Sequence, residues 1–150
     1  MNAPPLPAPP PLPVSTPFEW RVRVYWEDTD AGGIVFYANY LKFFERARTE
    51  WLRARGIEQQ RLRETAGGLF VVSATQVQYH RPARLDDLLL VTAAVTEAGR
   101  ASLTIAQSAR RDAPGGELLC EGSIRIGWVD AQSLSPRRMP AELLRALGLA

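Results

Sequence analysis

Hydrophobic and polar residues alternate at the start of the part of the chain that reads as folded. From Phe18 to Glu27 the apolar side chains recur at every second position, and polar or charged residues mostly fill the positions between them. A period of two over this length is typical of a strand with one buried face and one solvated face. We therefore predict a first strand over Phe18–Glu27.

A different period follows a short acidic turn. From Asn39 to Arg55 the bulky residues recur at spacings of three and four, which predicts an amphipathic helix. Gly56 is suited to end this helix, and Asn39 is suited to cap its first turn. The predicted buried face carries Tyr40, Phe43, Phe44, Ala47 and Trp51. So many aromatic residues on one face indicate a helix against which a sheet packs.

The remainder of the chain returns to strand-like patterns. After a polar segment with a short helical pattern (57–67), apolar residues alternate over Leu69–Tyr79, Asp87–Glu97, Ser102–Arg110 and Leu118–Val129, and a short helix is expected over Ala141–Leu149. Strands joined by short turns are antiparallel, because a parallel pair needs a crossover of a dozen or more residues. The pattern predicts an α+β fold: one domain over 18–150, with a five-stranded antiparallel sheet wrapped round one long central helix.

Residues 1–17 have a different composition from the domain. They hold eight of the twelve prolines in the chain, and they lack the basic start and apolar helical core of a signal peptide. We interpret them as a disordered or polyproline II leader outside the fold. A proline-rich ligand segment for an SH3-like domain is the alternative function for this leader.

Composition excludes several kinds of protein. The net charge of +2 is far below the dense basic surface of a nucleic-acid-binding protein, although it suits a phosphorylated small molecule. One cysteine, Cys120, permits no internal disulfide and indicates a reducing, cytoplasmic location. One histidine, His80, excludes a Cys/His zinc site and a Ser-His-Asp triad within one subunit. No apolar run reaches the ~20 residues of a membrane helix.

The acidic turn between the first strand and the helix carries the candidate chemistry. Asp30 precedes Gly32 and Gly33, which allow a sharp bend beside a carboxylate. The first amides of the following helix have no partner inside the helix. A carboxylate can serve as base or nucleophile, and free amides can bind a developing oxyanion, so the turn suits acyl chemistry. Asp28 is interpreted as part of a solvated strand end.

A calcium loop is the other hypothesis for this turn. The acidic residues followed by glycines are similar to the start of an EF-hand loop, which requires a carboxylate at its twelfth position. Counting from Asp28, that position is Asn39, so the calcium hypothesis fails.

Three segments resemble a known family. The run YWEDTDAGGIVFYANYLKFFERARTEWL, the later VQYHRPARLDD and the closing GSIRIGWVD resemble the 4-hydroxybenzoyl-CoA thioesterase family, most of all its YbgC-type acyl-CoA thioesterases, which are associated with the Tol-Pal system. The resemblance spans about 19–140. It implies a hotdog fold, the sheet-and-helix arrangement predicted above. It also implies a homodimer or homotetramer whose active sites lie between paired subunits.

The resemblance also implies roles for particular residues. Asp30 takes the place of the catalytic carboxylate, as nucleophile or as base for a water, and amides around Tyr37 polarise the thioester carbonyl. YbgC-type members usually have a histidine where this chain has Tyr37, whereas the 4-hydroxybenzoyl type has an aromatic residue there. Further substrate-binding candidates are Gly33, Val35 and Asn39 around the turn, with Arg84 and Arg100 for the phosphates of coenzyme A, since guanidinium groups fit phosphate geometry.

The predicted activity is hydrolysis of acyl-CoA thioesters to free acid and coenzyme A. No metal or bound cofactor is expected, because coenzyme A enters with the substrate; an acyl carrier protein is the alternative donor. Two other functions stay open on the same fold: a non-catalytic module that binds acyl-CoA or an acyl carrier protein, and an envelope-protein adaptor that uses the leader. A hydratase is disfavoured, because it generally needs a catalytic histidine and His80 lies outside the central motif.

Overall fold

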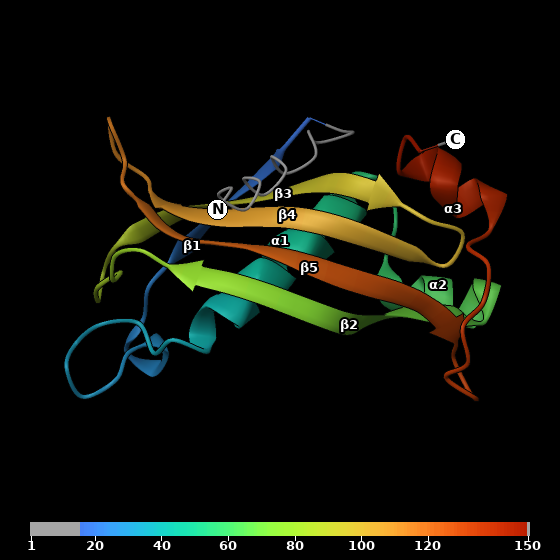
Figure 1. Ribbon diagram of the computed structural model, residues 1–150, viewed down its shortest axis with the longest axis horizontal. Coiled ribbons are helices and arrows are strands. Elements are labelled where there is room, and N and C mark those ends of the chain that lie inside the picture. Colours follow the sequence, from blue (N-terminus) through green and yellow to red (C-terminus); the bar gives the residue numbers. More distant parts are fainter. Residues whose placement is uncertain (1–15, 150) are drawn as a thin grey trace, which may run out of the picture.

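A computed structural model describes residues 16–149, so all of the predicted leader except Thr16 and Pro17 lies outside the described residues. Its elements are β1 (Phe18–Arg23), the 3-10 turn η1 (Trp26–Asp28), α1 (Asn39–Ala54), α2 (Gln59–Ala66), β2 (Gly68–Tyr79), β3 (Leu88–Ala98), β4 (Ser102–Arg111), β5 (Leu118–Asp130) and α3 (Ala141–Ala146). Figure 1 shows one sheet with α1 crossing a single face. None of the helices in 16–149 is long and apolar enough to span a membrane.

The five strands form one antiparallel sheet in the order β1-β3-β4-β5-β2. The two hairpins that join β3, β4 and β5 confirm the antiparallel prediction. Strand β2 does not pair with its successor β3. It lies at the opposite edge beside β5, and the 80–87 segment crosses the end of the sheet between them. Strands β1 and β2 are therefore the two edges of the sheet, each with one neighbour.

Helix α1 buries the face that its pattern predicted. Tyr40, Phe43, Phe44, Ala47 and Trp51 all belong to the core, and their neighbours there include Val91 and Val95 of β3, Leu103 and Ile105 of β4 and Trp128 of β5. Removing each large apolar side chain from water stabilises the fold by ~1.5–3 kcal/mol. The helix ends where expected, because Gly56 adopts the left-handed conformation with φ +80°.

The first strand is shorter than predicted. It ends at Arg23, and the chain turns through η1, which leaves Trp26 81% exposed although the alternation assigned it to the buried face. Val24 still exchanges main-chain hydrogen bonds with the 80–87 segment: its amide donates to Asp87 O (2.9 Å) and its carbonyl accepts from Asp86 N (3.1 Å). That segment therefore sets where the strand gives way to the turn. The last helix is also shorter than predicted and ends at Ala146.

The single thiol lies in the core. Cys120 is fully buried on β5, and this burial is the main reason that its pKa rises to about 12. A neutral, inaccessible thiol is a poor nucleophile. We therefore expect native protein at pH 8 to leave a thiol-reactive dye almost unreacted over minutes, whereas protein unfolded in guanidinium chloride titrates one thiol. Rapid native labelling, measured as dye absorbance, would contradict the buried placement.

Candidate active site

The loop between η1 and α1 is a tight, hydrogen-bonded turn. Thr29 and Val35 form an antiparallel bridge, Asp30 N donates to Ile34 O (2.9 Å), and Gly33 N donates to Asp30 O (3.0 Å). Gly33 adopts φ +77°, a conformation that other residues rarely take. The turn therefore presents Asp30 on its exposed side and places the predicted Gly33 beside it.

The Asp30 carboxylate is held by one oxygen only. Its Oδ1 accepts a hydrogen bond from Gly32 N (2.8 Å), and its Oδ2 has no hydrogen bond within residues 16–149. A Cβ at Gly32 would lie 3.2 Å from Oδ1, closer than such contacts usually are, so glycine suits this approach. The carboxylate is thus oriented by its own turn while one oxygen stays free to act as base or nucleophile.

The start of α1 offers unpaired amides in the same loop. The N–H groups of Tyr37 and Ala38 have no acceptor among residues 16–149, whereas Phe36 N donates to Asp28 O (2.9 Å) and ties the helix start to the turn. The carbonyls of the two peptide units are held: Phe36 O accepts from Asn39 N (2.8 Å), and Tyr37 O accepts from the Tyr79 hydroxyl (3.0 Å). Unpaired amides at a helix N-terminus can bind an anionic oxygen.

A buried polar pair lies beneath the turn, which the sequence reasoning did not find. Asn39 Nδ2 donates to Asp28 Oδ1 (2.6 Å), and Tyr25 N donates to Asp28 Oδ2 (2.8 Å). Asp28 is 3% exposed and Asn39 is 6% exposed. The interpretation of Asp28 as solvated is therefore wrong. So is the assignment of Asn39 as N-cap: Ala38 holds that position, and the Asn39 side chain is committed to Asp28 rather than open to substrate.

The 80–87 segment supports the turn from the other side. Ile34 forms a bridge with Arg84, and Val35 N donates to Ala83 O (2.9 Å). Arg84 is thus next to the turn, with an exposed side chain, as a phosphate contact requires. Val35 is 4% exposed and packs in the core, so its side chain is not available to a substrate. Tyr40 joins α1 to the same segment, because its hydroxyl accepts from Ala83 N (3.0 Å).

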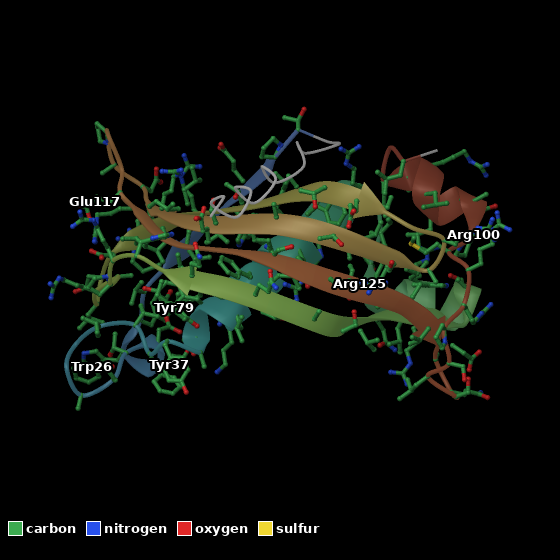
Figure 2. The ribbon with its side chains drawn as sticks, in the orientation of Figure 1. Trp26, Tyr37, Tyr79, Arg100, Glu117 and Arg125 are labelled. Atoms are coloured by element: carbon green, nitrogen blue, oxygen red, sulfur yellow. The ribbon has the colours of Figure 1, made fainter. Side chains whose placement is uncertain are left out.

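Arg100 is far from this turn within one chain. It lies in the β3–β4 connection, where its carbonyl accepts a hydrogen bond from Met139 N (2.8 Å). Figure 2 places Arg100 at one end of the molecule and Tyr37 and Tyr79 at the other. The fold brings Asp30, Gly33, Tyr37 and Arg84 together and leaves Arg100 apart.

Apolar side chains are exposed beside the site. Tyr37 is 64% exposed, Tyr79 is 49% exposed, and Leu41 and Val72 are also exposed. They line the open edge of β2 and the adjoining turns of α1. Because an edge strand presents unpaired main-chain groups and this one also has exposed apolar side chains beside it, this edge is a candidate interaction surface.

Comparison with known proteins agrees with the fold. The family model described as the thioesterase superfamily matches residues 32–118, and the chain belongs to that superfamily. It is 41% identical over 129 residues to the acyl-CoA thioesterase YbgC of Haemophilus influenzae (86% of this chain, 93% of that protein). It is 42% identical over 130 residues to the acyl-CoA thioester hydrolase YbgC of Escherichia coli (87% and 95%). The resemblance predicted from the motifs is confirmed.

Solved structures confirm the hotdog fold. A probable thioesterase from Bartonella henselae superposes with a TM-score of 0.78 at 30% identity, covering 83% of this chain and all of that one. A variant of 4-hydroxybenzoyl CoA thioesterase complexed with 4-hydroxybenzoyl CoA superposes with a TM-score of 0.82, covering 89% and 99%. At 19% identity this second match bears on the fold alone.

Proposed function

We propose that this protein hydrolyses acyl-CoA thioesters to the free acid and coenzyme A, with Asp30 as the catalytic carboxylate. The observation that supports this most directly is the geometry of one loop: a carboxylate with a free oxygen, tethered by main-chain hydrogen bonds to a helix start where the Tyr37 and Ala38 amides are unpaired. The names of the relatives point to the same substrate class.

The proposed reaction balances along either of two routes. As a nucleophile, Asp30 attacks the acyl carbon, the C–S bond breaks with loss of the coenzyme A thiolate, and water then hydrolyses the mixed anhydride. As a base, Asp30 takes a proton from water, which attacks the same carbon, and the thiolate again leaves. In both routes the carbonyl oxygen gains negative charge, which the Tyr37 and Ala38 amides stabilise by a few kcal/mol.

Tyr37 in place of histidine is compatible with both routes. Neither needs an imidazole, because the proton can pass to Asp30 and a thiolate is a good leaving group without a strong acid beside it. The proposed contribution of Tyr37 is its main-chain amide. Its exposed ring, in edge contact with Tyr79 at 6.3 Å, can line the entrance for the acyl group.

We also propose a homodimer, or a tetramer built from dimers, with active sites between subunits. Strand β2 is a 12-residue edge with one neighbour, and apolar side chains flank it. Antiparallel pairing of two β2 strands about a two-fold axis would join the sheets and cover those side chains. The Tyr79 end of one β2 strand, with Tyr37 beside it, would then meet the start of the other β2 strand.

A buried, reduced cysteine fits a cytoplasmic location. The proposals of a Tol-Pal association and of an acyl carrier protein as donor rest on the resemblance alone.

The direct test is a panel of short, long and aromatic acyl-CoAs, with released coenzyme A separated by chromatography. We expect turnover of at least one class, with kcat in the range of 1–10³ s⁻¹ that is usual for enzymes. Acyl-CoA binding measured by calorimetry without turnover of any member would reject hydrolysis in favour of the non-catalytic binding module. If the protein shows no acyl-CoA binding and no turnover, both the hydrolase and the binding-module hypotheses are rejected.

A further inference from the structure

Tyr79 reaches the start of α1 from a distant part of the chain. It is the last residue of β2, and its hydroxyl donates a hydrogen bond to Tyr37 O at 3.0 Å. Figure 2 shows the two side chains at the same end of the molecule. The Tyr79 ring also contacts the Tyr40 ring, with centroids 5.7 Å apart, so packing against α1 fixes its place.

This hydrogen bond acts on an amide as well as on a carbonyl. Tyr37 C=O and Ala38 N–H belong to one planar trans peptide unit and point in opposite directions. Fixing the carbonyl oxygen therefore fixes the direction of the unpaired Ala38 N–H. A donor on the oxygen also polarises the peptide unit and makes its N–H a stronger donor.

The Tyr37 and Ala38 amides are held by different means. The peptide unit that carries the Tyr37 N–H is held by the main chain, because Phe36 O accepts from Asn39 N. The unit that carries the Ala38 N–H is held at its carbonyl by a side chain, that of Tyr79. A single side-chain oxygen atom thus sets the orientation of one of the two donors.

We propose that Tyr79 is a positioning residue that orients and polarises the oxyanion-binding Ala38 amide. This role rests on the proposed thioesterase function. Tyr79 does not react with the substrate; it acts through the Tyr37–Ala38 peptide unit, and its contribution is largest when charge develops on the carbonyl oxygen.

The test is Tyr79→Phe, which removes the hydroxyl and keeps the ring contacts. We expect kcat to fall about two- to tenfold, the usual worth of one hydrogen bond, with KM little changed. Binding of an S-alkyl-CoA thioether, which has no carbonyl oxygen, should stay within twofold by calorimetry. Thr104→Val, an isosteric hydroxyl deletion on β4, serves as the control, with unchanged kcat.

Each outcome separates the hypotheses. An active parent with an equally active Tyr79→Phe variant overturns the role of Tyr79 alone. A variant that loses thioether binding or dimerisation in proportion to kcat has a structural defect, and this also overturns the role. A parent that turns over no acyl-CoA overturns the proposed function, and the positioning role with it.

Discussion

Replacing Asp30 with asparagine should lower kcat for acyl-CoA hydrolysis by about 10²–10⁴-fold, the usual contribution of a positioned base. An amide can neither accept a proton from water nor attack a thioester carbonyl, so both routes lose their reactive group. The side-chain carbonyl oxygen of the new residue can still accept from Gly32 N, which should preserve the turn. Released coenzyme A would be measured by chromatography in steady state, beside parent protein from the same preparation.

The matched control is Asp86→Asn. Asp86 is another exposed turn aspartate, and its side chain has no hydrogen bond within residues 16–149. Its φ of +72° is one that asparagine tolerates. We expect this control to retain parental kcat, and the Asp30 variant to bind the S-alkyl-CoA thioether normally. Equal turnover by the parent and the Asp30 variant would remove Asp30 from the mechanism and require another base.

Features that depend on local periodicity could be predicted from the sequence. The 3.6-residue pattern of Tyr40, Phe43 and Trp51 identified α1 and its buried face, because an amphipathic helix must bury one stripe. Gly33 beside Asp30 indicated the turn, since few other residues adopt its conformation. These two signals located the candidate site before any contact was known.

Features that depend on tertiary contacts could not be predicted. The order of the strands in the sheet was not predicted. Alternation in Leu69–Tyr79 shows which face of the strand is buried but not which strand lies beside it, and β2 pairs with β5 rather than β3. Asp28 looked like a solvated turn residue, since its partner Asn39 is eleven positions away and its burial comes from the packed helix start. Arg100 was chosen for its guanidinium group and its tight turn, and neither signal shows that the sheet places it at the end of the molecule opposite Tyr37. Its contact with coenzyme A stays a prediction.

Asp28→Asn should destabilise the protein by about 1–3 kcal/mol and lower kcat by up to ~10²-fold. Two donors, Asn39 Nδ2 and Tyr25 N, point at the two carboxylate oxygens in a buried setting. An asparagine offers only one oxygen, so its own amide group must face one of those donors. The main chain at position 28 also accepts a hydrogen bond from Phe36 N, so a shift of this residue displaces the start of α1. Thermal unfolding followed by circular dichroism, with kinetics on the same samples, measures both effects.

The reciprocal exchange, Asp28→Asn combined with Asn39→Asp, distinguishes a specific pair from general damage. In the double variant the new amide at position 28 can donate to the new carboxylate at position 39, while its oxygen accepts from Tyr25 N. The charge also stays near the positive end of the helix dipole. Asn39→Asp alone should lower Tm and kcat more than Asp28→Asn or the double variant does. Two buried carboxylates would then face each other where 2.6 Å now separates donor and acceptor. Recovery of both Tm and kcat in the double variant, relative to each single one, is the expected result. If the losses of Tm and kcat in the two single variants simply add in the double variant, Asp28 and Asn39 support the turn independently. The hydrogen bond between them is then not the contact that holds the catalytic loop to α1.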